Sequence, residues 1–314
     1  MKKLVTVVVL IVISLSVISD EYESLSVKVR AQNINGSAYY VPGLSGAATE
    51  FEGFISNAGF VVTSDGVVVF DALGSPSLGN AMLGEIREVT DKPIKVVVVS
   101  HYHADHIYGL QVFKEEGAEI WAPRGAWEYI DSELSENLLD SRRESLFPWV
   151  NDDTFIVEPD RVIDKDIEFS LGGHEFIINY FGQVHSDGDM SLLNITDKTL
   201  YSGDIIFEGR IPFVGDADII AWAKTIDRVR KMPVMYFVPG HGEASDNPKY
   251  TMDLTHRYLN YLLDNFKVVV EDMQEFDKAY DSIDWSEFEK ENAFDVANRK
   301  NAFAVYLYLE KISD

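Results

Sequence analysis

Four side chains that can bind metal ions follow a run of valines in the stretch VVVVSHYHADHIYGL, residues 96–110. The chain has only seven histidines, and three of them lie here together with Asp105. His101 and His103 are two positions apart, so on locally extended backbone their side chains point the same way. Asp105 and His106 are adjacent and cannot share a direction. The segment therefore offers two pairs of ligands aimed at two neighbouring points, as a two-metal site requires; the alternative is a polar loop with chance histidines.

One segment cannot surround two metal ions, so further ligands must come from elsewhere in the chain. His185 lies in FGQVHSDGD and His241 in VPGHGE, each beyond a strand-like run and close to a glycine, as ligands on loops should be. His174 and His256 lack this setting and are expected to be ordinary surface residues.

Asp204 is the predicted bridge between the two metal ions. Two dications a few ångströms apart repel each other unless a carboxylate and a hydroxide lie between them. Asp204 follows a glycine at the end of the strand-like run TLYSG. Taken alone it would read as a turn residue; together with the other candidates it reads as a ligand.

The elements expected to position these side chains alternate between strands and helices. Runs rich in β-branched and aromatic residues predict strands, with hairpin turns at 63–66 and 170–176, and helices are predicted near 78–90, 105–116, 124–146 and 218–231. This pattern indicates an α/β or α+β layered fold, in which ligand loops gather at the C-terminal ends of strands. Residues 20–247 are expected to form the domain that carries these side chains, and 248–314 a helical C-terminal extension packed on it.

The composition excludes several classes of function. The 314 residues include 46% hydrophobic ones, enough for a large core, and 52 acidic against 27 basic residues give a net charge of −25. Such a charge repels a phosphate backbone, so no nucleic-acid partner is expected, and the substrate is expected to be a small molecule. The absence of cysteine leaves only nitrogen and oxygen ligands for a metal. The oligomeric state is not predicted.

The first 19 residues have the pattern of a secretory signal peptide. Two lysines precede an apolar run from Leu4 to Ile18, which is short for the ~20 residues of a membrane-spanning helix, and Val17 and Ser19 suit cleavage after Ser19. We expect an exported, periplasmic protein without stable membrane insertion.

The order of these motifs resembles the metallo-β-lactamase superfamily, which implies an αββα four-layer sandwich with the metal site at one edge. The resemblance includes Asp71 in VVVFDAL as well as the seven residues above. It implies that His101, His103 and His185 hold a first zinc, that Asp105, His106 and His241 hold a second, and that Asp204 bridges them. It also implies that Asp71 supports the histidine loop from outside; the alternative is a turn residue that ends a strand.

Within that superfamily the chain is similar to the branch called quinoprotein relay system zinc metallohydrolases, through segments such as SGDIIFEGRIPFVGDAD. The commonest metallo-β-lactamases carry a cysteine where this chain has Asp204, which argues against efficient hydrolysis of their antibiotics. Glyoxalase II enzymes share the aspartate but recognise glutathione with basic residues in a C-terminal region that is acidic and aromatic here.

The resulting hypothesis is a binuclear hydrolase in which a metal-bridging hydroxide attacks an ester, lactone, thioester or amide carbonyl. Asp105 would orient that nucleophile or pass a proton. Zinc suits these ligands, with iron or manganese as alternatives. Competing hypotheses are a small-molecule phosphodiesterase on the same site and a periplasmic metal-binding or relay protein without catalysis. The loop at 207–218 could line the substrate mouth, with Arg210 meeting a carboxylate, or could be structural.

Overall fold

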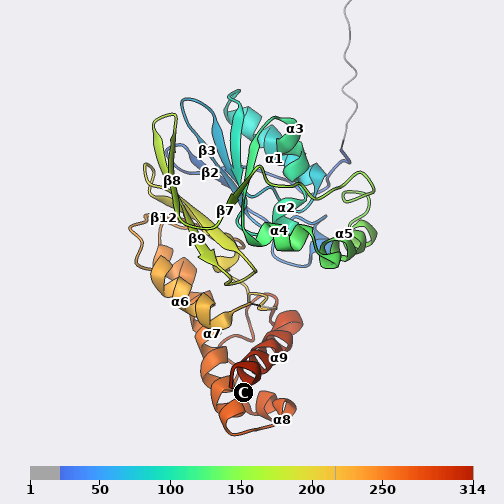
Figure 1. The fold of residues 1–314 in the computed structure, drawn as a ribbon, viewed down its shortest axis with the longest axis vertical. Coiled ribbons are helices and arrows are strands. Elements are labelled where there is room, and N and C mark those ends of the chain that lie inside the picture. Colours follow the sequence, from blue (N-terminus) through green and yellow to red (C-terminus); the bar gives the residue numbers. More distant parts are fainter. Residues whose placement is uncertain (1–21, 216, 314) are drawn as a thin grey trace, which may run out of the picture.

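The computed structural model describes residues 22–215 and 217–313, which form two β-sheets packed face to face with helices on both outer faces (Figure 1). The predicted signal peptide lies outside the described residues. The strands of the first sheet are β1 (Gln32–Asn35), β2 (Ala38–Val41), β3 (Ala58–Val62), β4 (Val67–Phe70), β5 (Ile94–Val98), β6 (Glu119–Pro123) and β7 (Arg161–Ile163), in that spatial order. Those of the second are β8 (Ile167–Leu171), β9 (His174–Gly182), β10 (Asp189–Asn194), β11 (Thr199–Tyr201) and β12 (Tyr236–Val238).

Both sheets are mixed, and their parallel pairs bring the C-terminal ends of several strands to one edge. β4, β5, β6 and β7 pair in parallel in the first sheet. In the second sheet β11 and β12 are parallel, and β9 runs the same way because both β9 and β11 pair antiparallel with β10. The segments that follow β4, β5, β9, β11 and β12 consequently start on a common side of the sandwich.

The alternation of side chains along the strands builds a layer of core on each side of the first sheet. Val67 and Val69 pack toward the helices, whereas Val68 and Phe70 pack toward the second sheet. Successive side chains of a strand point to opposite faces, so a strand that is buried on both faces reads as a continuous apolar run. The core between the sheets is completed from the second sheet by side chains such as Ile178, Leu192 and Tyr201.

The outer helices confirm the layered αββα prediction and correct two of the predicted helices. α1 (Pro76–Val89) agrees with the prediction, but 105–116 is divided into α2 (Ala104–Ile107) and α3 (Leu110–Glu115) at Gly109. A Cβ on Gly109 would lie 2.0 Å from the Ala72 carbonyl oxygen, so close packing against the chain after β4 requires glycine there. The predicted helix at 124–146 is likewise divided into α4 (Gly125–Ile130) and α5 (Glu133–Ser145), because Ser132 caps the start of α5.

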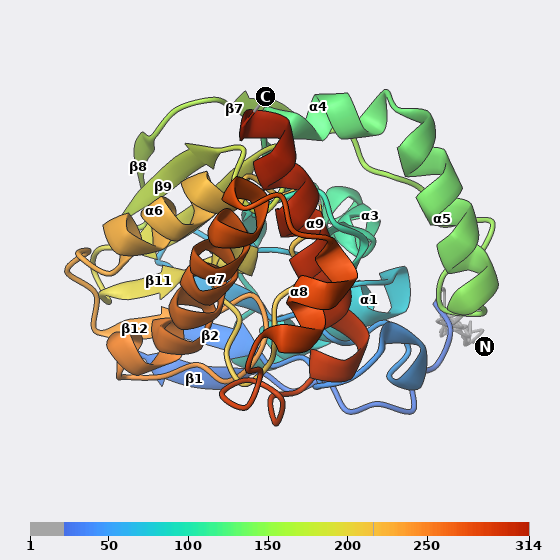
Figure 2. The same cartoon turned by 90° about the horizontal axis from the view of Figure 1, so that it is seen from below.

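The fourth layer joins the second sheet to the C-terminal helices through one continuous core. α6 (Ile219–Val229) was predicted, and it is followed by α7 (Pro248–Glu271), α8 (Phe276–Ser282) and α9 (Phe294–Ser313). Buried side chains of these helices share a cluster with Leu200 and Phe237 of the sheet. In Figure 1, α7, α8 and α9 extend away from the sandwich, and Figure 2 shows the same helices from below. Within the described residues no helix is both long and apolar enough to span a membrane.

Candidate metal centre

Seven predicted ligand residues, which are far apart in the sequence, lie together at the edge where the parallel strands end. His101 and His103 follow β5, and Asp105 and His106 lie on the short helix α2. The other three are His185 after β9, Asp204 in a 3-10 turn after β11, and His241 after β12. They form two groups, and within each group the ligand atoms lie within 4.8 Å of one another.

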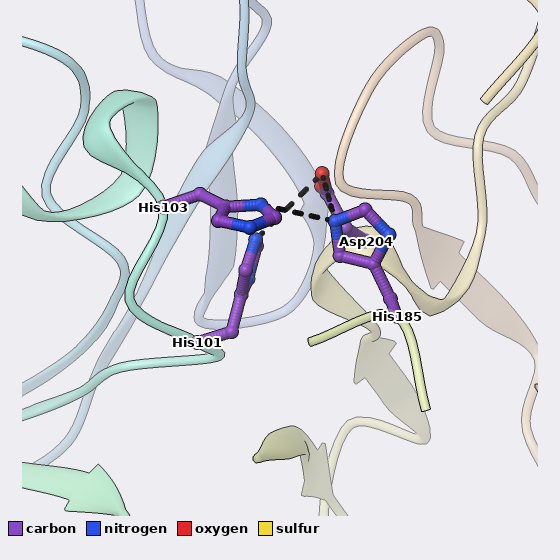
Figure 3. A group of neighbouring side chains, drawn as sticks. All are labelled: His101, His103, His185 and Asp204. Carbon is purple, nitrogen blue, oxygen red and sulfur yellow. Dashed lines mark hydrogen bonds and ion pairs between the residues drawn. The ribbon is translucent and has the colours of Figure 1, made fainter. Parts of the chain in front are cut away.

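The first group consists of His101, His103, His185 and Asp204 (Figure 3). The His103 Nδ1 and His185 Nε2 atoms are 3.1 Å apart, and His185 Nε2 lies 3.4 Å from Asp204 Oδ2. His101 Nε2 is 3.8 Å from the same carboxylate oxygen. Three imidazole nitrogens therefore face one small volume beside a carboxylate, which is the donor set of a zinc site with a position left for water.

The second group consists of Asp105, His106 and His241, and Asp204 contacts it as well. His241 Nε2 lies 3.4 Å from Asp105 Oδ2 and 3.3 Å from Asp204 Oδ2. The other oxygen of Asp204, Oδ1, lies 3.1 Å from His106 Nε2. Asp204 thus lies between the two groups, in the place that a bridging carboxylate would take.

Hydrogen bonds behind the rings orient their inner nitrogens toward the centre. Ser100 Oγ lies 2.8 Å from His101 Nδ1, and His241 Nδ1 donates to the Ile55 carbonyl oxygen at 2.7 Å. Each of these contacts occupies the outer ring nitrogen and leaves Nε2 facing the cluster.

Asp71 holds the histidine loop from behind, as the family resemblance implied. One carboxylate oxygen accepts the Ser100 backbone N–H at 2.6 Å, and the other lies 2.8 Å from His106 Nδ1. The residue is fully buried and has a φ of 60°, in the left-handed region. A buried non-glycine residue in this conformation costs of order 1–3 kcal/mol and persists where surrounding contacts hold it.

Two residues that sequence reasoning missed shape the loop that carries His241. The Asn57 side chain donates to the carbonyl oxygens of Pro239 and Gly242, at 2.9 and 2.7 Å. A Cβ on Gly240 would lie 2.1 Å from Asp204 Oδ1, so this position must be glycine if the carboxylate is to stay in place. Gly240 beside His241 was a visible signal in the sequence, whereas Asn57 had none.

Burial and neighbouring charges put His101, His185 and Asp204 in the protonation states that bind cations. Burial lowers the pKa of His101 and His185, to about 3 for His185, so these rings are neutral and keep a lone pair. Burial raises the pKa of Asp204, but His241 and His106 outweigh this effect and hold it well below its usual range. Neutral imidazoles and ionised carboxylates are the forms that ligate a dication.

The unsatisfied atoms of the cluster fit a metal ion. His101 Nε2, His106 Nε2 and Asp204 Oδ1 are sealed from solvent and have no hydrogen-bond partner in the described part of the chain. The last two are 3.1 Å apart, yet their geometry is not that of a hydrogen bond. Leaving such atoms unpaired costs about 1–3 kcal/mol each, whereas a cation bound by each group would satisfy them.

The two histidines expected to lie apart from the cluster do so. His256 on α7 is paired with Asp227 of α6 at 3.1 Å. His174 begins β9 but is half-buried rather than an open surface residue, because its ring lies 3.3 Å from Ser37 Oγ.

Comparison with known proteins gives the same family as the motifs. Residues 52–241 match the family model described as metallo-beta-lactamase superfamily. A metallo-beta-lactamase type 2 from Elizabethkingia meningoseptica is 28% identical over 212 residues, which is 65% of this chain and 77% of that protein. A linear primary-alkylsulfatase from Pseudomonas sp. (strain ATCC 19151) is 38% identical over 52 residues, which is 17% of this chain and 10% of that protein.

Solved structures share the fold at low identity. A sec-alkylsulfatase from Pseudomonas sp. superposes with a TM-score of 0.70 and 19% identity, and the match covers 89% of this chain but only 50% of that one. A metallo-beta-lactamase from Pontibacter korlensis gives a TM-score of 0.56 and 20% identity, over 74% of this chain and 99% of that one. The layered fold, the metal-ligand cluster and the family match together show that the chain belongs to the metallo-beta-lactamase superfamily and is a metal-dependent hydrolase.

Proposed function

We propose that this protein is a binuclear zinc hydrolase that acts on a carbonyl of an ester, lactone, thioester or amide. The observation that supports it best is the convergence of seven ligand-type side chains into two groups with Asp204 between them. His101, His103 and His185 would hold one ion and Asp105, His106 and His241 the other. All donors are nitrogen or carboxylate oxygen, which zinc accepts and which iron or manganese could also use.

When bound, the metal pair supplies a hydroxide nucleophile at neutral pH and positive charge for the carbonyl oxygen. The residues around the cluster supply rigidity. Asp71, Ser100 and the Ile55 carbonyl group hold the ligand rings in one orientation. Ligands that are held in this way need not rearrange during the reaction. Such preorganisation of charged and polar groups is the main source of electrostatic catalysis in enzymes.

Asp105 is the carboxylate of the cluster that is better placed to contact the attacking water. Its side chain is 21% exposed, whereas that of Asp204 is only 5% exposed. Burial raises the pKa of Asp105, but His106 and His241 outweigh it and keep this pKa below its usual range. The carboxylate is therefore ionised and can accept a hydrogen bond from the attacking water and orient it.

Replacement of His103 tests this function. His103→Ala should lower the metal content and reduce hydrolysis of phenyl and lactone esters by at least about a thousandfold, as removal of a ligand to the catalytic ion requires. His256→Ala, which alters a histidine outside the cluster, is the matched control and should keep both. Full metal content and full activity in His103→Ala would refute the assignment.

Hydrolysis of sulfate esters is a second candidate. It is favoured by the 52 residues that are 38% identical to an alkylsulfatase and by the fold shared with a sec-alkylsulfatase. A panel of a phenyl ester, an alkyl sulfate and a small phosphodiester, each given to the zinc-loaded protein, separates the three chemistries. Preferred turnover of the sulfate or the phosphodiester would replace the carbonyl substrate in this proposal.

We also propose that the protein is exported, because residues 1–19 have the pattern of a signal peptide. Cell fractionation with mass spectrometry of the mature N-terminus tests this: a chain that starts at Asp20 outside the cytoplasm is expected, and an intact Met1 terminus in the cytoplasm would overturn it.

A further inference from the structure

Arg210 is a buried cation next to the metal-ligand cluster, and no carboxylate in the described part of the chain pairs with it. Its relative exposure is 4%, and its Nε atom is sealed from solvent without a hydrogen-bond partner. The described residues place no carboxylate oxygen within 4.0 Å of its guanidinium group, although the surface holds many arginine ion pairs, such as Arg228 with Asp166. Burial of an unpaired charge is costly, so an arginine in this state is expected to bind an anion.

The neighbours of the guanidinium group do not satisfy it. Nη1 lies 3.5 Å from His241 Nδ1, but that nitrogen already donates its proton to the Ile55 carbonyl oxygen and so cannot accept another. The carboxylates whose charge acts on Arg210 are those of Asp105 and Asp204. Both belong to the predicted ligand set, and carboxylates engaged by cations would not neutralise an arginine beside them.

The loop that presents Arg210 is held rigidly by the C-terminal helices. The backbone of Ile211 donates to the Asn292 carbonyl oxygen at 2.8 Å, just before α9. Asn301 of α9 is buried, and its side chain donates to the Pro212 carbonyl oxygen at 2.7 Å and accepts the Val214 N–H at 2.9 Å. A guanidinium group on such a fixed loop is preorganised to bind a ligand.

An aromatic ring at the surface lies beside this arginine. The Arg210 guanidinium carbon lies 5.5 Å from the centroid of the Phe213 ring, and Phe213 is 42% exposed. The ring provides an apolar contact next to the cation, at a point of the loop that solvent reaches. A substrate with an anionic group on an apolar body matches this combination.

We propose that Arg210 binds an anionic group of the substrate, a carboxylate or a sulfonate-type oxyanion, so that this enzyme selects negatively charged esters over neutral ones. The inference rests on the proposed hydrolase function and names the substrate class of that site. Asn301 is a positioning residue, which acts through the loop. The competing role for Arg210 is a structural counter-charge to the metal-site carboxylates.

The test compares phenyl acetate with its 4-carboxylated and 4-sulfonated analogues on zinc-loaded protein. Arg210→Gln should lower kcat/KM for the charged esters about 10- to 100-fold more than for phenyl acetate, the range expected for the loss of a charge-assisted hydrogen bond. Differences in intrinsic reactivity between the esters cancel when variant and wild type are compared. The two charged esters show whether a planar or a tetrahedral anion is preferred.

Two further variants control the experiment. Arg210→Lys keeps the positive charge but lacks the planar set of N–H donors of a guanidinium group, and it should recover part of the preference for charged esters. Arg299→Gln removes a surface arginine that pairs with Asp277 and should leave the preference as in the wild type. Metal content, measured on each variant, identifies a purely structural effect, which would lower turnover of all three esters equally.

An equal ratio of charged to neutral turnover in wild type and Arg210→Gln would overturn the inference and leave the hydrolase function standing. Failure of the fully metallated wild type to hydrolyse any of the esters would instead count against the proposed function. In that case benzoate binding, measured by calorimetry, decides the inference: an affinity at least tenfold weaker in Arg210→Gln supports it, and equal affinity or no binding overturns it.

Discussion

Gly240 lies directly against the carboxylate between the two ligand groups. A Cβ placed on this residue would lie 2.1 Å from Asp204 Oδ1 and also within 2.7 Å of the Gly203 backbone. The obstruction includes backbone atoms, which cannot move aside as the end of a flexible side chain can. The smallest side chain at this position would therefore displace Asp204.

Gly240→Ala is expected to lower the metal content and to reduce hydrolysis at least about tenfold, because a small misplacement of a catalytic group has a large effect on rate. Metal analysis together with ester hydrolysis measures both. Gly84→Ala is the matched control: nothing lies within 4 Å of its Cβ position on α1, so it should be neutral or slightly stabilising. Normal metal binding in Gly240→Ala would show that Asp204 can move without consequence.

Asp71 fixes His106 rather than touching the centre itself. Asp71→Asn should weaken binding of the second metal ion about 10- to 100-fold, since outer partners of ligating histidines have effects of this size. Competition with a chelator measures the affinity. Asp65→Asn, at an exposed turn, should bind metal as the wild type does; a similar loss in both variants would contradict the specific role of Asp71.

The loop 207–215 depends on helix α9, which begins at Phe294. Asn301 satisfies the Pro212 carbonyl group and the Val214 N–H, and it also donates to Tyr258 Oη on α7 at 3.1 Å. The side chain thus links two helices to one loop in a buried setting. A substitution at Asn301 should therefore alter the position of Arg210, although the two side chains have no direct hydrogen bond.

Asn301→Ala leaves buried backbone groups unpaired and should destabilise the protein by about 1–3 kcal/mol. It should also raise KM for the charged esters more than for phenyl acetate, because the position of Arg210 is no longer held. Denaturant unfolding and ester kinetics measure the two effects. In Asn265→Ala the lost hydrogen bond lies within α7 alone, to the Tyr261 carbonyl oxygen, so the ester preference should persist. If Asn301→Ala loses stability but keeps the ratio of KM for the charged esters to KM for phenyl acetate, the contact of Asn301 with the loop does not affect substrate binding.

The two sheets meet at the predicted metal centre, so bound metal should contribute to the stability of the sandwich. His101, His103 and His106 follow β5 of the first sheet, while His185, Asp204 and His241 follow strands β9, β11 and β12 of the second. Ions held between them bind the folded state and not the unfolded one. Such binding stabilises by about 2.7 kcal/mol when free metal is at 100 times its Kd.

Removal of the metal with a chelator should accordingly lower the Tm by roughly 5–10 °C, given about 2–4 °C per kcal/mol for a domain of this size. Differential scanning calorimetry of the zinc-loaded and chelated protein measures the shift, and zinc should restore it. In His103→Ala the shift should be smaller. An identical Tm with and without metal would argue against ions that bridge the sheets.

Much of the fold was predictable because it follows from local patterns of apolar residues in the sequence. The valine runs of β4 and β5 read as strands buried on both faces, and this is how they pack. The predicted helices at 105–116 and 124–146 were too long, because the contact of Gly109 with Ala72 and the cap at Ser132 are not visible as periodicity. The αββα prediction is confirmed, whereas the boundary at residue 247 and the signal peptide stay predictions.

The sequence by itself predicted which side chains could bind metal and how they point within HYHADH, because these directions depend on the backbone over six residues. His185, Asp204 and His241 could be chosen because each follows a strand. Only the tertiary structure decided which groups stand behind the rings, such as the Ile55 carbonyl group and Asn57, and that Arg210 is buried without a carboxylate partner among the described residues. These contacts join segments up to 186 residues apart, and the packing of two sheets, rather than any local pattern, sets the distance between such segments.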